Sequence, residues 1–196
     1  CSFALYITIH EMESYMNLAK KIAALHIQAK NFARVLYSTK PISSFRDVKQ
    51  PHSKRDYQKP EGLWYECDKE WKEFVQRDYR SAMGVYRHKY ALEVNLNRMC
   101  VIRTEKEMKN FHRKYSYKAN SYDVVPNAID WVAVAKDYDG IEICPYQYKF
   151  RMEYSWYYGW DVASGCIWGR GAFKGVVELE NDIEDEEFKS TYEDWD

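Results

Sequence analysis

Two carboxylates in the later part of the chain lie where an acid could take part in a reaction. Asp161 lies between aromatic residues in WDVASGCIW, and Glu142 lies between two isoleucines in GIEIC. If GIEIC is a strand, the Glu142 side chain points away from both isoleucines and could reach a cleft, although an exposed strand glutamate fits the same pattern. For Asp161 the plainer interpretation is a side chain that caps a turn. Both are candidate catalytic residues with a structural alternative.

Short segments elsewhere carry residues that could bind a ligand. The candidates are Tyr37, Ser38, Thr39, Gly62, Leu63, Trp64, Tyr65 and Ser164. Gly62 would let the backbone turn sharply or approach a ligand closely. Trp64 and Tyr65 are neighbours in a predicted strand, so one faces the interior while the other can face a cleft and stack on a flat ring. Ser164 precedes a glycine within an apolar run, which indicates a bulge or a close backbone approach.

The remaining reactive residues fit none of the common catalytic motifs. Cys166 has no histidine nearby in the sequence, which favours a buried, inert thiol. The five histidines include no pair at helical spacing and the five cysteines include no CxxC, so we expect neither a metal site nor a disulfide framework. The chain also lacks the phosphate-binding motifs GxxxxGK[ST] and GxGxxG and the GxSxG of esterases.

Hydrophobic periodicity predicts the elements that must position these residues. The predicted helices cover 13–33, 68–80, 105–115 and 128–138. The predicted strands cover 34–39, 63–67, 90–96, 99–104, 140–144, 146–152 and 164–168. An irregular loop covers 40–60, and the strands at 90–96 and 99–104 are expected to form a hairpin. Helices gather first and strands later, which predicts an α+β fold with N-terminal helices packed on a mainly antiparallel, split β-sheet.

The charge is divided between a basic body and an acidic end. Residues 178–196 hold ten acidic side chains and one lysine, whereas residues 1–177 carry a net charge of +8. A solvated tail is the simple interpretation, and a tail that folds over a basic groove in place of an anionic ligand is the sharper one. We therefore expect a single α+β domain over 1–177 and an acidic C-terminal tail over 178–196.

The order of these segments resembles the mono-ADP-ribosyltransferase fold, PARP-like enzymes included. YST at 37–39, a variable loop and the GLWY strand resemble the opening of that fold, and the late acid would be Glu142 or Asp161. The resemblance covers about residues 34–168, although Tyr37 or Arg34 stands where the family has a first-strand Arg or His, and no ExE or QxE pair occurs.

This resemblance implies a particular reaction and set of partners. NAD would be the substrate, its nicotinamide–ribose bond would be cleaved without a metal, and ADP-ribose would pass to a protein or nucleic-acid acceptor or to water. The candidate binding residues of the first and second strands would contact NAD, and the late carboxylate would stabilise the positive charge that develops on the ribose, as in glycoside hydrolysis.

Two other functions fit the composition. Aromatic residues interleaved with lysine and arginine at 86–94 and 111–118 suit a non-catalytic module that binds nucleotides or single-stranded nucleic acid, or else form solvated amphipathic faces. The 7 Trp and 18 Tyr suit a protein-interaction domain. No run of eighteen apolar residues occurs, so we expect no membrane partner. The widely spaced cysteines favour a reducing compartment, and we expect a cytoplasmic protein.

Overall fold

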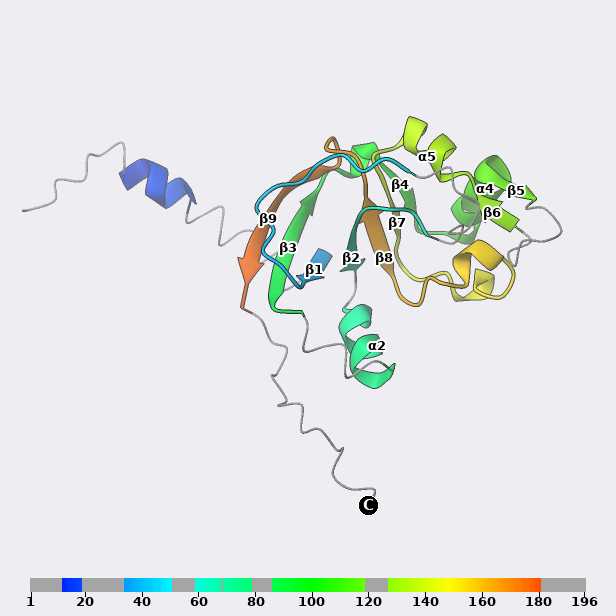
Figure 1. Ribbon diagram of the computed structural model, residues 1–196, viewed down its shortest axis with the longest axis horizontal. Coiled ribbons are helices and arrows are strands. Elements are labelled where there is room, and N and C mark those ends of the chain that lie inside the picture. The colour runs from blue at the N-terminus through cyan, green and yellow to red at the C-terminus, as the bar shows by residue number, and fades with distance from the viewer. Residues whose placement is uncertain are drawn as a thin grey trace, which may run out of the picture.

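The computed structural model describes residues 12–18, 34–50, 59–67, 69–78, 86–118 and 127–180 (Figure 1). Most of them build a seven-stranded sheet in the order β4-β7-β8-β2-β1-β3-β9 and a two-stranded sheet, β5-β6. The strands are β1 (Arg34–Ser38), β2 (Leu63–Cys67), β3 (His88–Val94), β4 (Met99–Ile102), β5 (Ser116–Lys118), β6 (Asn127–Ile129), β7 (Gly140–Ile143), β8 (Ser164–Ile167) and β9 (Phe173–Leu179). The helices are α2 (Glu70–Asp78), α4 (Glu105–Tyr115) and α5 (Trp131–Asp137), with 3-10 turns at Leu96–Arg98, Tyr148–Phe150 and Ser155–Tyr157. Residues 12–18 are helical and exposed.

Antiparallel pairing dominates the large sheet. Among the described strands, only β4 and β7 run parallel, with Met99 opposite Gly140. This mixture of helices and mostly antiparallel strands confirms the predicted α+β class. The hairpin predicted between 90–96 and 99–104 is wrong, because the 3-10 turn after β3 leads the chain to the far edge of the sheet, where β4 pairs with β7.

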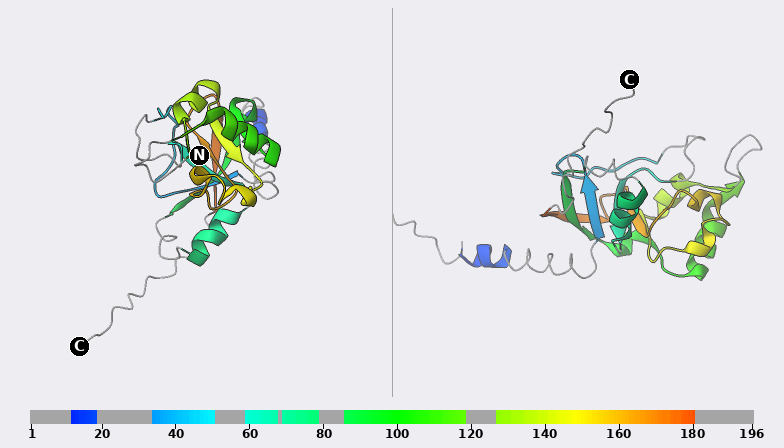
Figure 2. Two further views of the ribbon diagram at one scale, coloured as in Figure 1. Left: turned by 90° about the vertical axis from the view of Figure 1, so that its right-hand side faces the viewer. Right: turned by 90° about the horizontal axis from the view of Figure 1, so that it is seen from below.

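One face of the sheet carries an aromatic core. Ile141 and Ile143 of β7 and Cys166 of β8 pack there against side chains of α4, α5 and the last two 3-10 turns. Seen from the right-hand side of Figure 1, α4 and α5 lie in front of the large sheet (Figure 2, left). Every residue of β7 and β8 is buried, because both faces of these strands are covered.

The segment 41–50 covers part of the opposite face. Ile42 and Phe45 of this segment pack against a cluster that includes Leu36, Tyr65 and Ile167. The segment has no regular secondary structure, as predicted for the described part of the loop at 40–60. Residues 51–58 of that loop lie outside the described residues.

Local signals set the start of two helices. Thr104 caps α4 with a complete capping box, which confirms the helix predicted at 105–115. The α5 helix begins at Trp131, and Asp130 caps it, because its side chain accepts a hydrogen bond from the Ala133 amide. The predicted start at 128 is wrong, because residues 127–129 pair with β5 instead.

Two further predictions need correction or restriction. The strand predicted at 146–152 is wrong: residues 148–150 form a 3-10 turn that continues into a second turn, because this path buries the Phe150 ring, which stacks on Tyr154 at 5.0 Å between ring centroids. The predicted acidic tail begins too early, since β9 continues to Leu179. Residues 181–196, and residues 19–33 of the predicted first helix, lie outside the described part of the chain. No helix among the described residues is long and apolar enough to cross a membrane.

Candidate functional site

A pocket of about 260 Å³ opens beside strands β1, β2 and β8. Because β2 pairs with β1 on one side and with β8 on the other, segments far apart in the sequence meet at this pocket. Its lining residues are Val35, Tyr37, Lys59, Trp64, Tyr65, Glu66, Trp71, Phe74, Tyr86, Asp161, Val162 and Ser164. Pockets for drug-sized ligands measure about 300–1,000 Å³, so this pocket suits one flat ring and its neighbouring group.

Aromatic rings form one wall of the pocket. Tyr37 of β1 stacks on Trp71 of α2, with ring centroids 5.0 Å apart and planes at 24°. Tyr86 meets Trp71 edge to face at 5.0 Å and 89°. Such a wall offers ring faces to a planar ligand.

Glu66 holds this wall in place, although it is not among the candidate residues predicted from the sequence. Its side chain is buried, and its Oε2 accepts hydrogen bonds from the backbone amides of Trp71 (3.0 Å) and Lys72 (3.2 Å) at the start of α2. A carboxylate at a helix N-terminus satisfies amides that lack a partner within the helix. Alternation along β2 puts Glu66 on the same face as Trp64. This alternation could have identified Glu66 as a pocket residue from the sequence.

A lysine side chain lies at the rim of the pocket. Lys59 is exposed, and its Nζ lies 5.2 Å from the ring centroid of Trp64. Partial loss of hydration lowers the pKa of Lys59, and the nearby Asp161 carboxylate opposes this effect. The Trp64 ring in turn packs edge to face against Trp160 at 4.9 Å. The rim therefore combines a positive charge with an aromatic face.

Asp161 is the late carboxylate that the structure brings to the pocket. Its Oδ1 accepts a hydrogen bond from Nη2 of Arg151 at 3.1 Å, and about a third of its side chain is exposed. The Arg151 guanidinium lies 5.4 Å from the ring centroid of Tyr158. Asp161 is thus anchored at the pocket while it remains accessible to a ligand.

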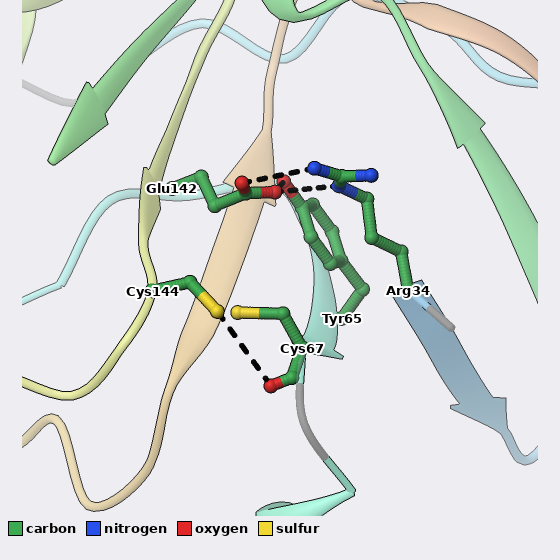
Figure 3. Close-up of polar contacts among 5 residues, drawn as sticks. All are labelled: Arg34, Tyr65, Cys67, Glu142 and Cys144. Atoms are coloured by element: carbon green, nitrogen blue, oxygen red, sulfur yellow. Dashed lines mark hydrogen bonds and ion pairs between the residues drawn. The ribbon is translucent and has the colours of Figure 1, made fainter. Parts of the chain in front are cut away.

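Glu142 does not line this pocket. It lies on the opposite face of the sheet, where its carboxylate accepts hydrogen bonds from Arg34 at 2.6 and 3.0 Å and from the Tyr65 hydroxyl at 2.8 Å (Figure 3). The expectation of an exposed strand glutamate is wrong, since only 2 % of the residue is exposed. A side chain at Gly165, between Tyr65 and Glu142 in the sheet, would collide with the Tyr65 ring at 2.2 Å.

The electrostatics of this cluster follow from burial and pairing. Burial acts to lower the pKa of Arg34, but the hydrogen bonds and attraction of Glu142 outweigh it and raise the pKa overall. Burial, followed by the Glu142 carboxylate, raises the pKa of Tyr65. Arg34 therefore stays charged and Tyr65 stays protonated, so that both remain hydrogen-bond donors to Glu142.

The predicted binding residues divide into two groups. Tyr37, Trp64 and Ser164 line the pocket with Asp161, and Tyr65 borders it although its hydroxyl reaches Glu142 on the opposite face. The residues that do not line it are Ser38, Thr39, Gly62 and Leu63.

These four residues have other surroundings, and Thr39 is exposed to solvent. The Ser38 hydroxyl donates to the Lys40 carbonyl, and Leu63 packs in the core of the opposite face. Gly62 has φ +155°, and a Cβ there would lie 2.3 Å from the Ile167 carbonyl oxygen, so its role is a close backbone approach.

The aromatic and basic stretches are largely amphipathic. Tyr90 in 86–94 and both Phe111 and Tyr115 in 111–118 are buried. Cys166 is buried, as expected, and burial raises the pKa of its thiol. Among the described residues, no group of three or more His, Cys, Asp or Glu side chains is placed to hold a metal ion.

No protein-family model, curated protein or solved structure matches this chain.

Proposed function

We propose that this chain is an NAD-dependent enzyme of the ADP-ribosyltransferase type, with the β1–β2–β8 pocket as its active site. The proposal depends chiefly on one observation, that Tyr37, Trp64 and Asp161 line the same pocket although more than 120 residues separate the first from the last. These are the first-strand, second-strand and late acidic positions that the resemblance implies.

The chemistry of the pocket suits the positively charged end of NAD. The ring faces of Tyr37, Trp71 and Tyr86 can hold a flat nicotinamide ring, and an aromatic face attracts a cationic one. Lys59 at the rim can contact a phosphate of the dinucleotide. The pocket would therefore take the nicotinamide end, with the remainder of NAD lying outside it.

The proposed reaction breaks the bond between the nicotinamide nitrogen and C1′ of the ribose. The electron pair of that bond leaves with nicotinamide, which becomes neutral, and positive charge develops on the ribose. The Asp161 carboxylate would stabilise this charge. A nucleophile of a protein or nucleic acid, or water, then attacks C1′ and loses its proton. No step in this sequence requires a metal ion.

Nicotinamide release from NAD tests the proposal. We expect the wild-type protein to release nicotinamide, and Asp161→Asn to slow the release about 100-fold or more with little change in the unfolding midpoint. The matched control is Asp137→Asn, because Asp137 also pairs with a cation, Lys114, but lies on α5 outside the pocket. A wild-type chain that neither binds nor cleaves NAD, or a fully active Asp161→Asn variant, would contradict the proposal.

A non-catalytic nucleotide-binding module is the second candidate. The observation that favours it is that Lys59 and Lys89 each lie over an aromatic ring of the pocket, Trp64 and Tyr37. Such a module would bind NAD or another nucleotide in calorimetry without releasing nicotinamide. For either function we propose a reducing, cytoplasmic setting, since the four described cysteines are all thiols.

A further inference from the structure

Two cysteine side chains, Cys67 and Cys144, lie close together on the face of the sheet opposite the pocket (Figure 3). Cys67 is the last residue of β2 and Cys144 directly follows β7, and these two strands flank β8. The Cys144 thiol donates to the Cys67 carbonyl oxygen with an S···O distance of 3.8 Å. Figure 3 shows the two sulfur atoms facing one another on the side of the sheet that carries Glu142.

The register of the sheet explains why they meet. Residues two apart in a strand share a face, so Cys67 follows Tyr65 and Cys144 follows Glu142 on the same face. The hydrogen bond from Tyr65 to Glu142 spans β8 over Gly165, which has no side chain to separate them. Cys67 lies two residues after Tyr65, and Cys144 lies two residues after Glu142, so the two thiols are also neighbours on this face.

We propose that Cys67 and Cys144 are a thiol–disulfide modification site, oxidised by a small disulfide such as oxidised glutathione. Cys144 is partly exposed and is the sulfur that a reagent can reach, whereas Cys67 is buried beside it. The other described thiols are poor candidates, because burial raises the pKa of Cys100 to about 12 and the pKa of Cys166 well above its usual value.

The reaction balances without any other reagent. The Cys144 thiolate attacks oxidised glutathione, which forms a mixed disulfide and releases one reduced glutathione. The Cys67 thiolate then attacks the Cys144 sulfur and releases the second glutathione. Two protein thiols lose two electrons and two protons, and one glutathione disulfide becomes two thiols. The new bond would join the ends of β2 and β7, one residue from Glu66 of the pocket.

The test uses the full chain in glutathione buffers of increasing oxidised fraction, followed by acid quenching, alkylation and peptide mapping. We expect a linked pair of peptides that contain Cys67 and Cys144. Cys67→Ser should stop at glutathione on Cys144, and Cys144→Ser should leave Cys67 unmodified over the same period. Cys166→Ser is the matched control and should retain the link.

The peptide map of the wild-type chain tests the proposal even if a variant fails to fold. The proposal is overturned if both thiols remain open to alkylation after denaturation at every buffer ratio, or if either sulfur is linked to a different cysteine. A link that appears only when the chain is unfolded during oxidation would also overturn it. The experiment needs no NAD, so its result is independent of the proposed enzymatic activity.

Discussion

Replacing Glu142 by alanine should strongly destabilise the fold. In the native protein the Glu142 side chain is 3 % exposed and accepts three hydrogen bonds, two from Arg34 and one from Tyr65. Glu142→Ala leaves a largely buried guanidinium and a buried hydroxyl without their acceptor. Breaking a buried ion pair in this way costs about 3–5 kcal/mol of unfolding free energy.

That loss is large enough to measure directly. For a chain of about 150–250 residues, 1 kcal/mol corresponds to roughly 2–4 °C in the unfolding midpoint, so we expect a fall of about 6–20 °C. Glu142→Gln keeps the size and one acceptor oxygen, so it should lose less than Glu142→Ala. Tryptophan fluorescence during urea unfolding would give the same ranking as a free energy.

Glu93→Ala is the matched control. Glu93 also lies on a strand and pairs with a lysine, Lys174 at 3.6 Å, but 39 % of its side chain is exposed. Exposed pairs contribute about 0–1 kcal/mol, so this variant should unfold close to the wild type. If Glu142→Ala is no less stable than Glu93→Ala, the account of a buried, mutually dependent cluster is wrong.

Three further perturbations follow from single contacts. Gly165→Ala should destabilise the protein by about 1–3 kcal/mol or more in urea unfolding, because the new Cβ would collide with the Tyr65 ring at 2.2 Å; a variant as stable as the wild type would contradict this packing. Thr104→Ala removes the cap of α4 and should cost about 0.5–2 kcal/mol, while Thr104→Ser should retain most of the stability. Burial lowers the pKa of His112, whose Nδ1 lies 3.1 Å from the Trp156 indole nitrogen and can accept its N–H. The unfolded chain therefore takes up a proton near pH 6.5 more readily than the folded chain, so stability should fall as the pH drops from 7.5 to 5.5. His112→Phe should flatten that fall in thermal melts, and an unchanged slope would refute the assignment.

Local patterns predicted several elements well. Alternation placed Glu142 on the face opposite Ile141 and Ile143, and the structure has it there. Thr104 predicted the start of α4, because a capping side chain acts within its own turn of helix. Such features depend on residues one to four positions apart, which the sequence displays directly.

Other predictions are wrong because contacts between residues far apart in the sequence decide the local structure. The sequence pattern predicts a helix from residue 128, yet residues 127–129 pair with β5. The aromatic run at 146–152 contains a 3-10 turn in which the Phe150 ring packs into the core while Tyr148 stays exposed. In both places contacts with distant side chains outweigh the local preference. The β4–β7 pair is parallel and joins residues about forty positions apart, so no turn sequence between the two strands could predict it.

The sequence by itself determined which residue types were available: an aromatic first strand, an aromatic second strand and two late carboxylates. Only the tertiary structure decided between those acids. Residues 140–143 pair with β8 in a register that turns Glu142 toward Arg34 and Tyr65, whereas the turn before β8 brings Asp161 to the pocket. The physical reason is that a strand's register fixes which face each side chain occupies, and register depends on partners far away in the chain.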